Sequence, residues 1–151
     1  MFGDKQFSRE ILRIGDNAGD MRPAFDEVHD LFLDVESRQF ASQGGAYSGG
    51  WRPLAPATKA RKARLNLDPR ILHETLRLRK SLTNKTHTDH IYRSSADEMF
   101  VGTKVPYAGP HQNPKSSNPL PRRRPIEFSD AIRRDIIKIL QRHLVGERRF
   151  W

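Results

Sequence analysis

Two stretches rich in glycine and proline divide this chain and limit the length of its regular elements. The first, residues 43–57, contains four glycines between Gly44 and Gly50, followed by Trp51-Arg52-Pro53-Leu54 and Pro56. The second, residues 109–125, carries four prolines between Gly109 and Pro121. Glycine favours turns, and proline lacks the backbone N–H that a helix or a central strand needs. We therefore predict a long loop in each stretch.

Three segments have the spacing of amphipathic helices. Over residues 21–42, Asp20 is a suitable N-cap and Phe25, Val28, Phe32 and Val35 form an apolar stripe. The opposite face is predicted to be acidic and solvated, and its residues are Asp26, Glu27, Asp30, Asp34 and Glu36. A second helix is predicted over about residues 70–83, and a third from Ser129-Asp130 to Gly146. A short basic helix is expected after Thr58, its predicted cap, with a solvated face.

The remaining regular segments favour strands. Residues 85–93 and 99–105 are rich in Thr, Ile, Tyr and Val, and residues 94–98 between them read as a turn, so an antiparallel hairpin is predicted. Residues 7–14 are interpreted as an edge strand and residues 126–128 as a short strand. We expect one domain, residues 1–151, of the α+β class: three main helices packed on a small antiparallel sheet, with long glycine- and proline-rich loops and a tail at 147–151.

The charge of the chain is unevenly distributed. Residues 1–51 contain 5 basic and 9 acidic side chains, a net charge of −4, whereas residues 52–151 contain 22 basic and 9 acidic side chains, a net charge of +13. One interpretation is a nucleic-acid surface on the basic part, which would act without sequence preference because no known recognition motif is visible. The other is head-to-tail self-assembly, in which the acidic part of one copy meets the basic part of the next.

The sequence offers little for catalysis or metal binding. There is no cysteine, which excludes disulfides, a thiolate nucleophile and a cysteine zinc site, and fits synthesis in a cytoplasm. In a strand His87 and His90 would point to opposite faces, and no nucleophile motif accompanies His111. We therefore expect neither an enzyme nor a bound metal or cofactor, and the lack of a long apolar run predicts no membrane span.

A series of short motifs follows the first predicted helix. In order they are Arg38-Gln39-Phe40 before the glycine run, Trp51-Arg52-Pro53-Leu54 with Pro56 and Thr58, Ile71-Leu72 with Thr75, Leu78 and Ser81, Val101-Gly102-Thr103, Tyr107-Ala108-Gly109-Pro110-His111-Gln112, and Arg124-Pro125-Ile126 before the capped helix. Over about residues 24–144 this ordered set resembles the phage virion morphogenesis family. That family includes tail-completion proteins of contractile-tailed phages and looks related to the head–tail joining neck proteins of siphophages.

The resemblance implies a structural subunit of a tailed-phage virion that acts in tail completion and head–tail joining by forming a ring at the neck. Its implied partners are further copies of itself in a cyclic ring, with a hexamer favoured over a dodecamer, together with tail tube or tail terminator proteins and head connector proteins. It also implies non-specific contact with DNA in the channel and no membrane. The implied location is the head–tail junction of the virion, after synthesis in the bacterial host cytoplasm. The alternative function is a sequence-independent nucleic-acid-binding module.

The same resemblance suggests a subunit interface made from the two loops and the basic run that follows them. Its residues are Trp51, Pro53 and Leu54, which would anchor the first loop, Tyr107, His111 and Gln112, which would begin the second, and Arg122, Arg123 and Arg124, which would face a neighbouring subunit or the DNA channel. The alternative for Trp51 and Tyr107 is packing in the core of their own chain.

Overall fold

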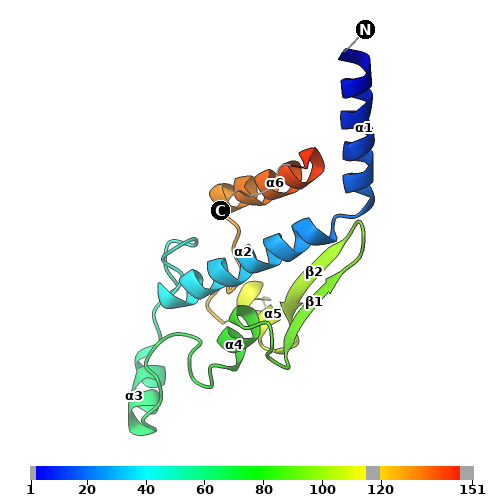
Figure 1. The fold of residues 1–151 in the computed structure, drawn as a ribbon. Coiled ribbons are helices and arrows are strands. Elements are labelled where there is room, and N and C mark those ends of the chain that lie inside the picture. Colours follow the sequence, from blue (N-terminus) through cyan, green and yellow to red (C-terminus); the bar gives the residue numbers. More distant parts are fainter. Residues whose placement is uncertain (1–2, 115–119, 147–151) are drawn as a thin grey trace. The chain divides into compact units, whose positions relative to one another are not determined.

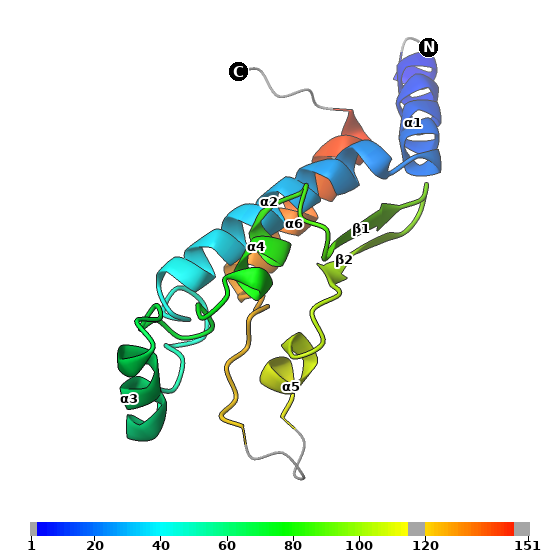
Figure 2. The ribbon, with the colours of Figure 1, turned by 90° about the horizontal axis from the view of Figure 1, so that it is seen from below.

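A computed structural model describes residues 3–114 and 120–146 of the chain. Within these ranges the elements follow one another as α1 (Gly3–Gly19), α2 (Arg22–Ala41), α3 (Pro56–Arg64), α4 (Arg77–Thr83), β1 (His90–Ser94), β2 (Met99–Thr103), α5 (Ala108–Gln112) and α6 (Asp130–Val145), drawn in Figures 1 and 2. The strands form one two-stranded sheet. These helices and the antiparallel pair confirm the α+β class. Among the described helices, none combines the length and apolarity that crossing a bilayer would require.

The contacts of the chain group it into two compact units. Unit 1 consists of residues 1–31, 92–101 and 129–151, and unit 2 consists of residues 32–91 and 102–128. Helix α2 and the hairpin each contribute residues to both units. The predicted tail, residues 147–151, and part of the second loop, residues 115–119, lie outside the described residues.

Helix α2 forms as its apolar spacing predicts. The Asp20 carboxylate accepts the backbone N–H of Arg22 at 3.1 Å, which satisfies one of the free donors at the helix start. The predicted stripe from Phe25 to Val35 is buried. The prediction of a solvated acidic face is wrong at Glu36, which is fully buried. Glu36 lies one turn from Phe32 and one turn from Phe40, so it shares their buried face.

In unit 1, helix α6 packs on the N-terminal half of α2. The α6 helix begins where Ser129 Oγ accepts the backbone N–H of Ile132 and ends at Gly146 with φ +74°, as predicted. Ile139 packs with Ala24 and Val28 in the core, and Met99 of β2 packs against them. An ion pair between Arg142 and Glu27 lies beside this core.

Helix α1 replaces the edge strand predicted for residues 7–14. The prediction was wrong because it took Gly15-Asp16 as the end of a short element, whereas the helix continues through both residues to Gly19. Its end is fixed to α6, since Asn17 Nδ2 donates to Leu144 O at 3.0 Å and the His143 ring N–H donates to the carbonyls of Asn17 and Asp20.

The hairpin is shorter than predicted. Strand β1 begins at His90, because residues 84–89 form turns in which the Asn84 side chain accepts the N–H of Thr86. Strand β2 occupies Met99–Thr103. The predicted turn is confirmed at residues 95–98, where Ser95 N donates to Glu98 O at 2.8 Å, whereas Ser94 still belongs to β1.

The helix predicted over residues 70–83 is confirmed only in its second half. Leu72 and Leu76 both have φ +58°, a left-handed conformation that interrupts a helix. The backbone N–H of Ile71 instead donates to the side chain of Gln43 at 2.6 Å, and Nδ1 of the buried His73 bonds to Ile71 O. One bond to the distant Gln43 side chain and one local bond of His73 thus hold this segment away from the helix that its own periodicity favours.

The basic helix α3 differs from its prediction at both Thr58 and Lys62. It begins at Pro56, so Thr58 lies inside it and does not cap it. The fixed φ of proline suits a first helical position. Lys62 is buried rather than solvated, and its ammonium donates to the carbonyls of Asp68 and Arg70 at 2.9 and 2.8 Å. This lysine therefore fixes the turn that follows α3.

Candidate assembly site

Trp51 holds the first loop against the end of α2. Its side chain is buried, and its ring meets that of Phe40 edge-on at a centroid distance of 5.3 Å. The Trp51 backbone N–H donates to Gln43 O at 2.8 Å. Gly44 has φ +82°, and a Cβ there would lie 2.3 Å from Cδ1 of Trp51. The loop therefore closes in this form because glycine lies directly against the indole.

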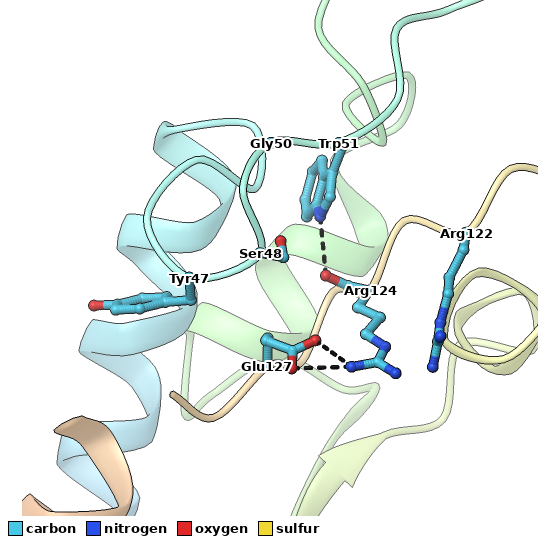
Figure 3. Close-up of a pocket in the computed structure, with 7 residues that line it drawn as sticks. All are labelled: Tyr47, Ser48, Gly50, Trp51, Arg122, Arg124 and Glu127. Atoms are coloured by element: carbon cyan, nitrogen blue, oxygen red, sulfur yellow. Dashed lines mark hydrogen bonds and ion pairs between the residues drawn. The ribbon is translucent and has the colours of Figure 1, made fainter. Parts of the chain in front are cut away.

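The backbone carbonyl of Arg124 joins the first loop to the second. It accepts the indole N–H of Trp51 at 3.0 Å and the side-chain amide of Gln39 at 3.3 Å. The same Gln39 amide donates to Ser48 Oγ at 2.8 Å. Figure 3 shows the indole pointing at this carbonyl. Because buried donors and acceptors are costly to leave unpaired, these bonds fix both loops together.

Arg123 lies inside the chain and not on the outward face expected for the basic run. It is only 7% exposed. Its Nε donates to Arg52 O at 2.9 Å and its Nη2 to Pro53 O at 3.2 Å. Burial lowers the pKa of the Arg123 guanidinium, and the neighbouring charge of Arg52 adds to this effect. Carbonyl acceptors offset the cost of burying such a group, so Arg123 ties the proline-containing part of the first loop to the second.

Gln112 fixes the far end of this connection. Its side-chain amide donates to Ile126 O at 2.7 Å, and its carbonyl accepts the Ile126 N–H at 3.1 Å. These bonds occupy the backbone N–H and C=O of Ile126, which a neighbouring strand would otherwise pair. The short strand predicted at residues 126–128 does not form. The prediction of a loop is also wrong at residues 109–112, which belong to the short helix α5. We call residues 121–126, which carry all these connections, the strap.

An open hollow lies where the first loop meets the strap. Its volume is about 340 Å³, and its lining residues are Tyr47, Ser48, Gly50, Trp51, Arg122, Arg124 and Glu127 (Figure 3). Nη1 of Arg124 donates to both carboxylate oxygens of Glu127, at 3.0 and 2.8 Å. Arg122 is exposed and lies on the side of the hollow away from Tyr47. This arrangement offers a cation and hydroxyl groups to an approaching polar or acidic surface.

A second hollow of about 330 Å³ has more apolar walls. Its lining residues are Leu54, Thr58, Lys62, Leu72, Glu74, Thr75, Tyr107, His111 and Arg123. The Tyr107 ring is partly exposed and meets the His111 ring edge-on. Nδ1 of His111 is buried without a hydrogen-bond partner among the described residues. Burial, followed by the charge of Arg123, lowers the pKa of His111, so this imidazole is uncharged at neutral pH.

The sequence-predicted interface residues thus meet around one structural feature. Trp51, Arg123 and Gln112 build the connection between the loops, whereas Leu54, Tyr107 and His111 line the second hollow. Pro53 and Arg122 are exposed, and Arg124 is half-buried. Across residues 3–114 and 120–146, no three histidine, aspartate or glutamate side chains are placed to hold a metal ion.

Sequence reasoning missed several residues of this site. Gln39 and Glu127 bond to the strap, and Gly44 makes room for Trp51. Arg124 and Glu127 are three residues apart, and this spacing of opposite charges in the sequence could have indicated their ion pair. The partners of Gln39 are 9 and 85 residues away, and no local pattern indicates them.

A model of the phage virion morphogenesis family matches residues 3–145. The chain belongs to this family. The match includes α1, which lies outside the range of the sequence resemblance, and it covers both compact units. This phage virion morphogenesis protein therefore has a structural role in building a phage particle. No curated protein and no solved structure matches it.

Proposed function

We propose that this virion morphogenesis protein is a structural, non-catalytic subunit that completes the phage tail and joins it to the head. Copies of the chain would form a cyclic ring at the neck, with a hexamer favoured over a dodecamer. The ring would contact tail tube or tail terminator proteins on one side and head connector proteins on the other. The observation that carries this proposal is the family match over residues 3–145.

The loop site supports an assembly role. Two loops that are distant in the sequence are held together by partly buried hydrogen bonds, so the surface around them is fixed before a partner arrives. That surface carries the exposed Arg122 and a partly exposed Tyr107, side-chain types that are common in protein interfaces. The opposite net charges of residues 1–51 and 52–151 favour head-to-tail contacts between copies.

A sequence-independent nucleic-acid-binding module is the second candidate function. Its support is the net charge of +13 in residues 52–151. Several of these arginines already have acidic partners in the same chain, which would compete with phosphates for them. Ion pairs join Arg61 to Glu74, Arg70 to Asp68, Arg77 to Asp89 and Arg124 to Glu127, and Arg123 is buried. A steep loss of DNA affinity with salt would be the signature of this function.

Deletion of the reading frame in the phage, followed by negative-stain electron microscopy of the lysate, tests the proposal. The expected result is DNA-filled heads beside unattached tails. Tails of irregular length would indicate a role in ending tail growth, and tails of normal length a role in joining. Normal, infectious, joined particles would refute the proposal and move the nucleic-acid function to first place.

Complementation with charge-reversed variants then tests the loop site. Arg122→Glu changes an exposed residue of the hollow, so the fold should remain and joined particles should decrease strongly. The matched control is Arg134→Glu, an equally charged change at an exposed position of α6. Equal loss with both variants would point to overall charge and not to the loop site.

A further inference from the structure

Two buried cations line the second hollow, and both belong to unit 2. Lys62 of α3 is 4% exposed and Arg123 of the strap is 7% exposed. Among the described residues, each of them donates side-chain hydrogen bonds to two backbone carbonyls and forms no ion pair with a carboxylate. Lysine and arginine are rarely buried without a counter-charge, because carbonyl oxygens accept their N–H groups but leave the net charge in place.

The acidic residue in the lining of this hollow is already paired. Glu74 is exposed, and its carboxylate accepts Nη2 of Arg61 at 2.6 Å. Burial lowers the pKa of the Arg123 guanidinium, and the positive charge of Arg52 lowers it further. Both effects act against a buried positive charge, and a negative group brought into the hollow would offset them. The second hollow is therefore electrostatically suited to an anionic ligand.

The hollow also offers hydrogen-bonding groups that the described chain does not use. An ammonium has three N–H donors and a guanidinium has five, and Lys62 and Arg123 each donate two of them to carbonyls. Nδ1 of His111, another lining residue, is buried without a partner among the described residues. A carboxylate suits such a site, because its two oxygens each accept hydrogen bonds and its charge strengthens them.

The walls of the second hollow favour a protein side chain over a nucleic-acid backbone. Leu54, Leu72 and Tyr107 share the lining with the two cations. The phosphates of DNA form a closely spaced row of charges, which suits lysines and arginines that are exposed. Because these cations are buried beside apolar side chains, a ligand has to bring one charge inward on a short apolar stem. Aspartate and glutamate do so, since methylene groups separate their carboxylate from the backbone.

We infer that the second hollow binds an aspartate or glutamate side chain from an exposed segment of another protein of the phage particle. The inference rests on the proposed function and deepens it, because it gives the chemistry by which this chain recognises a partner. Complementary charge of this kind selects one partner and fixes its register. Exposed acids of a second copy are less suited to this role, since several pair within their own helix, as Glu10 does with Arg13 and Asp34 with Arg38.

Photo-crosslinking in the phage tests this inference. Benzoylphenylalanine is placed at position 107 of the full-length chain during infection, where it replaces the partly exposed aromatic ring of Tyr107, and purified particles are irradiated. The expected product joins this chain to a segment of one other virion protein that contains an aspartate or glutamate. The matched control is the same probe at position 65, because Leu65 is 50% exposed in the same unit and does not line the hollow. Position 65 should give little of this product.

Substitutions on each side of the contact then show whether the carboxylate is recognised. Replacing the acid of the crosslinked partner segment with its amide should reduce the product at least about tenfold, and this change leaves the fold of the present chain untouched. In the present chain, Thr75→Glu adds a carboxylate at an exposed lining position and should reduce the product similarly. Its neutral control, Thr75→Gln, should leave most of the product.

Several outcomes would overturn the inference and leave the ring proposal intact. They are a product that survives replacement of the partner's acid, equal losses with Thr75→Glu and Thr75→Gln, and crosslinks from position 107 only to DNA or to a second copy of this chain. The absence of any crosslink from position 107 in particles that contain the chain would also overturn it. If the chain is absent from purified particles, the proposed function itself fails.

Discussion

Replacing Glu36 with glutamine tests the consequence of burying a carboxyl group among the aromatic residues of α2. Glu36 is fully buried, and neither of its carboxylate oxygens has a hydrogen-bond partner among the described residues. Desolvation by burial raises the pKa of Glu36 well above the usual value of a glutamate. The folded protein therefore holds a proton on Glu36 at pH values where the unfolded chain has released it.

The direction and size of the pH effect follow from proton linkage. Between the unfolded pKa and the raised folded pKa, the folded state binds more protons, so the free energy of unfolding falls as the pH rises. The loss is about 1.4 kcal/mol for each pH unit in this window. Glutamine has a similar shape and does not titrate. Glu36→Gln should therefore match the wild type at about pH 5 and be more stable at about pH 7, by at most about 1.4 kcal/mol for each pH unit within this window.

The assay is urea unfolding at both pH values, followed by tryptophan fluorescence in a Trp151→Phe background. Trp51 then reports alone, and it lies in the same compact unit as Glu36. The matched control is Asp34→Asn on the same helix, where an exposed carboxylate pairs with Arg38, and it should change stability by about 0.5 kcal/mol or less. If the difference between Glu36→Gln and wild type is the same at both pH values, the burial argument is refuted.

Three further predictions concern local geometry, each measured by urea unfolding. Gly44→Ala should destabilise the protein by about 2–4 kcal/mol, because it combines a left-handed φ with a Cβ 2.3 Å from Trp51. Its control, Gly15→Ala in α1, should stabilise the protein by about 0.5–1 kcal/mol, because its Cβ meets nothing within 4 Å. Equal effects of the two substitutions would contradict this prediction. Trp51→Phe should lower the free energy of unfolding by about 1–2 kcal/mol, because it removes the hydrogen bond to Arg124 O and some packing. An unchanged free energy of unfolding would mean that this bond contributes nothing to stability. Ser129→Ala should cost about 1 kcal/mol, and an unchanged stability would show that the cap of α6 is dispensable.

The sequence predicts the elements whose signals are local. Helix α2 follows from its apolar stripe, and α6 follows from the Ser129 cap and the terminal Gly146, because each signal acts within a few residues of its effect. The same reasoning failed at residues 70–76, where the periodicity is helical but Gln43 captures the N–H of Ile71. It also failed at α1, whose apolar residues do not face its own core.

The site was predictable in composition but not in geometry. The sequence motifs identified Trp51, His111 and the arginine run as residues of interest. They could not indicate that Arg123 is buried while Arg122 is exposed, because the acceptors of Arg123 lie 70 and 71 residues away. Glu36 is a similar case: its charge predicts exposure, whereas its position one turn from both Phe32 and Phe40 decides its burial.

The strap has a consequence for the order of events during synthesis on the ribosome. Trp51 bonds to the carbonyl of residue 124, and the carbonyls of Arg52 and Pro53 are taken up by residue 123. Translation delivers the chain from its N-terminus, so the first loop leaves the ribosome well before these partners exist. Until then the indole N–H and both carbonyls lack these partners, and the first loop has only its contacts with the end of α2. A nascent chain of this protein therefore completes its loop surface only after residues 123 and 124 have left the ribosome.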